Sequence, residues 1–228
     1  NAVRVILGKK TESAEEDQTP DKPKLKPLYA WAGSKRKLIE TDYKKYFPSV
    51  KNKGSFVEPF FGGGAMFCHM YNNFKNIKHF TVNDFNEHIC LILNSIKNNN
   101  EEFIKYIEIL NEDFQEMKNK DKTIDNKCFQ YRKDMFLKIR ELYKQEEKNT
   151  VFSASLLLFL FSHCFRGLYS QDKQGLCNNS YGYSNKTIDI DNVKAWHEAL
   201  QKTDIFNGSY EKVEVRESSF VFCDPPYR

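Results

Sequence analysis

Hydrophobic residues recur at helical spacing over much of the chain. In the range 101–118, Phe103, Ile107, Leu110 and Phe114 fall on one side of a helix. The same pattern predicts amphipathic helices over residues 35–46, 87–97, 101–118, 128–144 and 191–202, and a buried helix over the apolar range 153–165. Stripes of this kind predict packing surfaces of the core, not a functional site.

Three short apolar runs have the pattern of buried strands instead. They cover residues 55–58, 80–84 and 218–223, with helical ranges between them. The first run leads into a glycine turn, and the other two end in a carboxylate. Because ligands bind at the carboxyl edge of open α/β sheets, these strand ends are candidates for a common site.

The turn after the first strand contains Gly62, Gly63 and Gly64, and a helix is predicted from Ala65. Glycines at such a turn allow backbone amides to approach a ligand closely. The spacing is not that of the dinucleotide fingerprint. About twenty residues further on, the second strand ends at Asp84, and an acid at this offset typically accepts hydrogen bonds from ribose hydroxyls. Together these features predict a site for a nucleoside-containing cofactor.

The last strand ends in Asp224-Pro225-Pro226-Tyr227. The two prolines stop the strand and fix an extended turn. The turn holds a carboxylate, a proline carbonyl and an aromatic ring, which suit a flat, amine-bearing ring with two N–H groups to donate. The alternative is a proline-rich loop after an ordinary core strand.

The residues of these motifs and their order along the chain resemble those of the Dam-type DNA adenine methyltransferases. The matching segments are Trp31-Ala32-Gly33-Ser34-Lys35, Val57 to Gly64, Asn83-Asp84 and Asp224 to Tyr227. The cofactor motif first and Asp-Pro-Pro-Tyr last is the arrangement of the family's α group. The resemblance covers residues 28–228, although between Asn94 and Phe152 it depends on helical pattern alone.

The resemblance implies a Rossmann-like, S-adenosylmethionine-dependent methyltransferase sheet of the α/β class with a helical target-recognition insert. It implies a cofactor-binding part over 27–94, the insert over 95–212 with a hairpin at 167–185, and a catalytic strand and loop over 213–228. The charged and proline-broken range 11–26 separately predicts a linker or disordered lead over 1–26. The substrate would be an adenine flipped out of double-stranded DNA.

The resemblance also implies roles for individual residues. The catalytic loop would be Asp224, Pro225, Pro226 and Tyr227. The cofactor S-adenosylmethionine would be bound by Trp31, Gly33, Lys35, Glu58, Phe60, Gly62, Gly64, Asp84 and Asp224. Contacts with DNA in and beside the hairpin would come from Arg166, Tyr169, Ser170, Lys173, Asn178 and Asn179.

The chain departs from the family pattern at two places. Ser170 stands where members that read GATC have an arginine, and serine cannot replace its bidentate contact with guanine, so the resemblance does not imply GATC. The family sheet also continues after the catalytic loop, whereas this sequence stops at Arg228. We therefore expect the C-terminal part of the sheet to be missing here, and a further segment or a second polypeptide to complete it.

Charge and cysteine content add modest constraints. The formal net charge is +4, but residues 22–53 hold ten lysines or arginines against two acids, which suits a polyanion such as DNA. The six cysteines show no metal-binding or disulfide spacing, so we expect free thiols, no bound metal and a reducing intracellular compartment, cytoplasmic or at a nucleoid or viral replication site. No apolar run reaches membrane-spanning length.

Two other functions remain compatible with these patterns. One is an amino-methyltransferase that acts on RNA or on a protein amide. The other is a non-catalytic DNA-binding or scaffold subunit of a modification complex, which the incomplete sheet would suit.

Overall fold

The computed structural model describes residues 24–43, 50–125 and 127–225. Its elements follow in the order α2 (Arg36–Glu40), β1 (Ser55–Glu58), α3 (Ala65–Asn73), β2 (His79–Asp84), α4 (Glu87–Asn98), α5 (Asn100–Ile124), α6 (Gln130–Gln145), α7 (Val151–His163), η2 (Phe165–Gly167), α8 (Ile190–Leu200), β3 (Thr203–Asn207), η3 (Tyr210–Lys212) and β4 (Ser219–Val221). The linker or disordered lead predicted over 1–26 lies almost entirely outside the described residues.

The four described strands form one parallel sheet in the order β3-β2-β1-β4. Its register pairs Phe56 of β1 with Phe80 of β2 on one side and with Phe220 of β4 on the other. The chain moves outward from β1 to β2 and β3, and then returns to the opposite side of β1 with β4. The strand order therefore reverses between β1 and β4, which is where doubly wound sheets bind their ligands. This confirms the predicted Rossmann-like α/β class.

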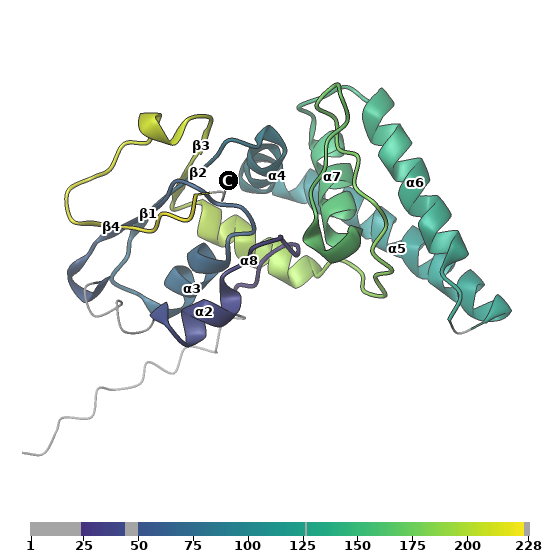
Figure 1. Cartoon of the computed structure of the whole chain (residues 1–228), viewed down its shortest axis with the longest axis horizontal. Coiled ribbons are helices and arrows are strands. Elements are labelled where there is room, and N and C mark those ends of the chain that lie inside the picture. The colour runs from purple at the N-terminus through teal and green to yellow at the C-terminus, as the bar shows by residue number, and fades with distance from the viewer. Residues whose placement is uncertain (1–23, 44–49, 126, 226–228) are drawn as a thin grey trace, which may run out of the picture.

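The helices divide into two groups (Figure 1). Helices α2 and α3 lie beside the sheet, and α4 and α8 pack against each other and against β3. Helices α5, α6 and α7 pack on one another on the side of the molecule away from the sheet. Helices α4 and α7 are in contact, so one hydrophobic core continues from the sheet into the helical part.

Strand β3 corrects the range predicted for the helical insert. It pairs with β2 from Thr203 to Asn207, inside the range 95–212. The sequence Thr-Asp-Ile-Phe-Asn is short and does not have a continuous apolar run, so its pattern gave no strand prediction. The division into a cofactor-binding part and a target-recognition insert stays a prediction, but residues 203–207 belong to the sheet.

The predicted helices are present, but the residues at which they begin and end differ from the prediction. The predicted helix 35–46 is α2, which ends at Glu40, whereas α5 continues past the predicted residue 118 to Ile124. The range 153–165 is α7, and its N-terminus is a capping box in which Thr150 and Ser153 exchange hydrogen bonds.

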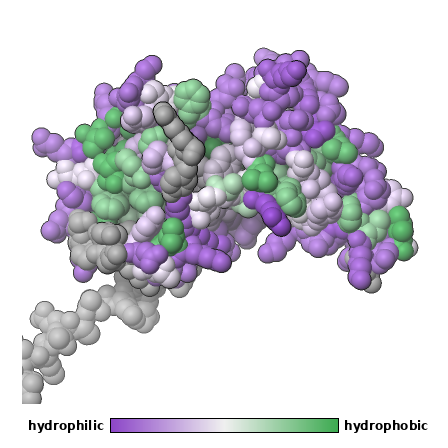
Figure 2. Space-filling model, viewed as in Figure 1, coloured by the Kyte–Doolittle hydropathy of each residue, from purple (hydrophilic) through white to green (hydrophobic). Residues whose placement is uncertain are grey.

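The last apolar run forms a strand, as predicted, but the prediction that it is buried is wrong. Within the described residues β4 pairs only with β1, and Val221 is 38 % exposed. Hydrophobic surface gathers over the sheet side of the molecule, whereas the helical side is mostly hydrophilic (Figure 2).

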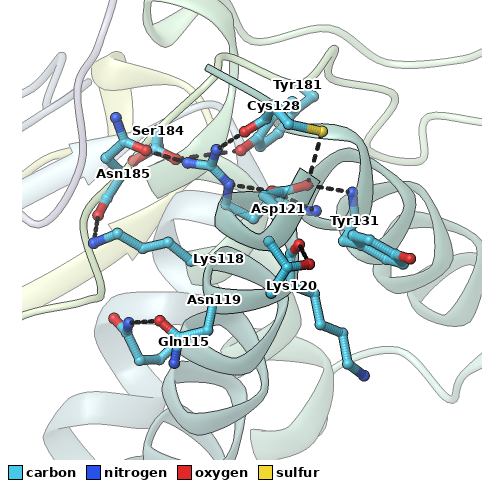
Figure 3. Close-up of polar contacts among 12 residues, drawn as sticks. Gln115, Lys118, Asn119, Lys120, Asp121, Cys128, Tyr131, Tyr181, Ser184 and Asn185 are labelled. Carbon is cyan, nitrogen blue, oxygen red and sulfur yellow. Dashed lines mark hydrogen bonds and ion pairs between the residues drawn. The ribbon is translucent and has the colours of Figure 1, made fainter. Parts of the chain in front are cut away.

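A buried ion pair joins the helices of the insert. The Nε atom of Arg132 lies 2.6 Å from Oδ2 of Asp121, and both side chains are almost inaccessible to solvent. Asp121 also accepts the backbone N–H of Tyr131, and the guanidinium bonds to the Ser184 carbonyl and the Asn185 side chain (Figure 3). This network holds α5, α6 and the end of the predicted hairpin range in one arrangement.

Candidate active site

The carboxyl ends of β1, β2 and β4 open into one cavity of about 750 Å³. Most of the predicted cofactor residues line it, together with the start of the predicted catalytic loop. They are Trp31, Gly33, Lys35, Glu58, Phe60, Gly62, Asp84, Asp224 and Pro225. The structure thus brings together residues that are up to about 190 positions apart in sequence, at the point where the strand order reverses.

The glycine turn shapes the floor of the cavity through two left-handed residues. Gly62 has φ = 54°, and a β-carbon there would come within 3.0 Å of the Trp31 ring. Gly64 has φ = 67° and is the N-cap of α3, where a β-carbon would meet the Phe61 ring at 2.5 Å. Gly64 does not line the cavity itself. Any contribution of Gly64 to cofactor binding is therefore indirect, through the shape of the turn.

Two of the carboxylates are held by backbone amides. Asp84 accepts the N–H of Gly62 through Oδ2 at 2.8 Å and the N–H of Asn86 through Oδ1 at 2.9 Å. Glu58 accepts the N–H of Phe67 through Oε2 at 3.1 Å. Desolvation raises the pKa of Asp84, although the backbone hydrogen bonds oppose it. Burial raises the pKa of Glu58 well above its usual value, and the charges of Asp224 and Asp84 add to this.

The third carboxylate, Asp224, follows β4 and pairs with a lysine. Its Oδ2 atom lies 2.6 Å from Nζ of Lys35, which also donates to the Gly33 carbonyl at 2.9 Å. Pro225 is the next residue on the cavity wall. Pro226 and Tyr227, the other predicted members of the catalytic loop, lie outside the described residues.

Several residues of the cavity were not predicted from the sequence. Phe85 is 84 % exposed, directly after Asp84, and Tyr210 of η3 is 54 % exposed with its ring 5.1 Å from that of Phe60. An aromatic residue directly after a strand-terminal acid is a pattern that could have been recognised. Tyr210 gave no such pattern, because it reaches the cavity only through the path of the chain after β3.

The hairpin predicted over 167–185 has its turn at residues 172–175. Gly175 N–H donates to the Asp172 carbonyl, and the Asp172 side chain accepts from the N–H groups of Gln174 and Leu176. The two arms are joined by an isolated bridge between Gln171 and Cys177 and by the bond from Asn178 N–H to the Ser170 carbonyl. They are therefore paired antiparallel arms without continuous strands.

Five of the six residues predicted to contact DNA are at least partly accessible. Arg166, Ser170 and Lys173 are exposed, and Tyr169 and Asn178 are partly exposed. Asn179 is fully buried and accepts the Ser170 N–H, so its role is to hold the hairpin, which corrects the prediction. Tyr169 has internal contacts as well, because its ring stacks on Trp31 and its hydroxyl bonds to His88, and its predicted contact with DNA stays a prediction.

The described residues show neither metal-binding clusters nor membrane-spanning helices. No cluster of three or more histidine, cysteine or acidic side chains with metal-binding geometry occurs among them. None of the helices in the described ranges is long and apolar enough to cross a membrane.

Comparison with known proteins agrees with this geometry. The family described as D12 class N6 adenine-specific DNA methyltransferase matches residues 31–228. The type II methyltransferase M.MjaIII of Methanocaldococcus jannaschii is 29 % identical over 213 residues, which are 90 % of this chain and 70 % of that protein. The DNA adenine methylase of Haemophilus influenzae is 26 % identical over 90 % of this chain and 66 % of its own length, and the DNA N-6-adenine-methyltransferase of Escherichia phage P1 is 25 % identical over 95 % of this chain and 26 % of its own length. The chain belongs to the D12 class of N6 adenine-specific DNA methyltransferases.

Proposed function

We propose that this DNA adenine methyltransferase takes its methyl group from S-adenosylmethionine bound in the cavity, and that Asp224 receives the amine of an adenine flipped out of duplex DNA. The observation that carries the proposal is the position of Asp224. It lines the same cavity as the glycine turn and the acidic ends of β1 and β2. The donor and the acceptor of the methyl group can therefore meet there.

The cavity residues fit this cofactor. Three carboxyl groups and one ammonium line the cavity, which favours a ligand that carries positive charge, as a sulfonium and an amino group do. The volume of about 750 Å³ lies in the range of small-molecule sites, about 300–1,000 Å³. Asp84 would accept the ribose hydroxyls, since a carboxylate has lone pairs beyond the two used by Gly62 and Asn86.

The other cofactor residues would act as walls. Glu58 and the glycine turn would face the methionine portion and the adenosine, and Phe60 would contribute an apolar wall. Phe85 is exposed and lines the cavity, and its ring would stack on the purine of the cofactor. Trp31, Gly33 and Lys35 would close the site from the N-terminal side.

The cofactor supplies a methyl group already activated for displacement, so the protein needs only to provide a nucleophile in line with it. The exocyclic amine of adenine is a poor nucleophile, because its lone pair is delocalised into the ring. Hydrogen bonds from its two N–H groups to the Asp224 carboxylate and the Pro225 carbonyl would localise that lone pair on nitrogen. The new N–C bond forms as the S–C bond breaks, and the surplus proton leaves through Asp224 or water. Orientation of this kind lowers barriers by about 7–11 kcal/mol.

The Lys35 contact suits this role. It directs one oxygen of Asp224 and keeps the carboxylate beside the cavity, and a carboxylate accepts up to about four hydrogen bonds. Pro226 and Tyr227 are proposed on the family resemblance alone, Tyr227 as the ring that stacks on the flipped base, a contact worth about 1–3 kcal/mol.

Duplex DNA would approach from the hairpin side. Arg166 and Lys173 would contact phosphates, and Ser170 and Asn178 would lie near the bases. These roles depend on exposure and on position in the hairpin.

A transfer assay tests the proposal. The chain should bind S-adenosylmethionine and move a tritiated methyl group onto adenine in duplex DNA, and not onto RNA or protein. Transfer to RNA or to a protein amide would contradict the substrate. Absence of cofactor binding at millimolar concentration would contradict the assignment of the cavity.

A further inference from the structure

Tyr169 belongs to the hairpin by sequence but not by position. It follows η2 and lies two residues after Gly167, whose carbonyl accepts the N–H of Ala32. Its ring stacks on Trp31 with a centroid distance of 5.6 Å and an interplanar angle of 29°, and packs edge-on against Phe161. One face of the Trp31 side chain is thus supported by the first residues of the hairpin, while Gly62 lies close to the same indole.

The hydroxyl of Tyr169 is fixed by a histidine of α4. It lies 3.0 Å from Nδ1 of His88, whose other ring nitrogen, Nε2, lies 2.9 Å from the hydroxyl of Tyr143 on α6. His88 is buried and belongs to the first turn of α4, where its N–H donates to the Asn86 side chain. The backbone N–H of Asn86 in turn donates to Asp84. The hydroxyl of Tyr169 is therefore anchored to the helix that begins next to the cavity.

These contacts form one connected path. It runs from the hairpin through Tyr169 to Trp31 on the cavity wall, and from the Tyr169 hydroxyl through His88 to α4. A neutral imidazole has one donor and one acceptor nitrogen, so the two tyrosine hydroxyls satisfy both. Burial lowers the pKa of His88, which favours this neutral form.

We propose that Tyr169, oriented by His88, is a positioning residue that holds the Trp31 wall in the geometry that binds the cofactor. The proposal depends on the proposed function, in which that cavity binds S-adenosylmethionine. It adds that the segment predicted to read DNA also sets the shape of the cofactor site. Tyr169 itself does not line the cavity.

The chain offers a matched pair of variants to test this. Tyr169→Phe and Tyr143→Phe each remove one hydroxyl from the same histidine and leave the ring in place. Of these two tyrosines, Tyr169 packs on Trp31, whereas Tyr143 bonds to the other ring nitrogen of His88. Comparable losses in thermal unfolding midpoint would show that the two variants damage the fold equally.

The kinetic result separates positioning from a general structural role. Tyr169→Phe should raise the KM for S-adenosylmethionine about threefold to tenfold, the range expected for one lost hydrogen bond, with kcat at saturating cofactor within about twofold of wild type. Tyr143→Phe should leave both constants within about twofold. An equal rise of KM in both variants, or no rise in Tyr169→Phe, would overturn the proposal.

Tryptophan fluorescence gives a reading that does not depend on the cofactor. The chain has two tryptophans, and the second, Trp196, is buried in the core and packs on Phe67. Tyr169→Phe should therefore increase acrylamide quenching of Trp31 in the ligand-free protein, and Tyr143→Phe should not. Quenching in Tyr169→Phe that is identical to wild type would contradict the positioning role, whether or not the wild-type chain binds the cofactor. Failure of the wild-type chain to bind the cofactor would refute the proposed function instead.

Discussion

Nζ of Lys35 lies 2.6 Å from Oδ2 of Asp224, which joins the residue before α2 to the residue three positions after β4. The pair lies on the cavity wall beside the ends of β1 and β2. The pair holds the Asp224 carboxylate beside the cavity, where we propose that it faces the reactants, and the first prediction concerns that carboxylate.

Asp224→Asn should abolish most methyl transfer while leaving cofactor affinity within a few-fold of wild type. The amide would present an N–H where the adenine amine needs an acceptor, and losing one such preorganised polar contact costs about 100- to 1,000-fold in kcat. Single-turnover transfer and equilibrium cofactor binding measure the two effects. Asp204→Asn is the matched control, because Asp204 is also an ion-paired aspartate but lies away from the cavity. Normal turnover in Asp224→Asn would remove the residue from the mechanism.

Glu58→Gln should stabilise the ligand-free protein near neutral pH and weaken cofactor binding. Burial raises the folded-state pKa of Glu58, and the charges of Asp224 and Asp84 add to this. Above the unfolded-state pKa, the unfolded chain therefore releases this proton more readily than the folded protein does, and the free energy of unfolding falls as the pH rises. Glutamine keeps an oxygen for the Phe67 N–H and carries no charge. Urea denaturation at pH 5 and pH 8 should show a gain that increases with pH.

The control for that experiment is Glu116→Gln, a surface residue of α5 that pairs with Lys120. It should change stability little at either pH. A loss of stability in Glu58→Gln at pH 8 would mean that the carboxylate is stabilised in the folded protein by a contact that we have not identified.

Acid should destabilise the fold in part through His88. Its folded-state pKa is below the usual 6.5, so the unfolded chain binds the proton more readily. This difference in pKa contributes to the free energy of unfolding above pH 6.5, and the contribution is lost as the pH falls below that value. Denaturation midpoints between pH 7.5 and 5 should decline less steeply in His88→Gln than in wild type, and His69→Gln on α3 serves as a control for removal of one histidine.

The buried pair of Asp121 and Arg132 should show asymmetric energetics. Arg132→Ala should lower the free energy of unfolding by about 3–5 kcal/mol, because it leaves Asp121 buried without its partner. Replacing both residues by leucine should cost less than either single alanine substitution. Lys120→Ala, which breaks an exposed pair on the same helix, should have a much smaller effect. Equal losses in the single and double variants would show that the hydrogen bonds to Asn185 and Cys128 dominate.

Local patterns predicted the parts of the site that depend on one segment at a time. Asp84 ends one strand and the glycine turn comes shortly after another, so their place at the sheet edge follows from the strands themselves. The orientation of Tyr169 and the burial of Asn179 depend on contacts with other helices, among them α4 and α6, which lie tens of residues away, and no local pattern contains that information. The exposure of β4 likewise depends on which neighbours it has.

The support of Trp31 by Tyr169 has a consequence for the order of events during synthesis. The two residues are separated by more than 130 positions, and Asp224 lies further still from its partner Lys35. Contacts between such distant residues form late, after the intervening chain has emerged and collapsed. A ribosome-bound chain that ends before the hairpin should therefore contain the complete glycine turn and Asp84 and yet have no cavity, so the emerging enzyme should gain its affinity for a donor molecule only after the residues up to Asp224 have emerged.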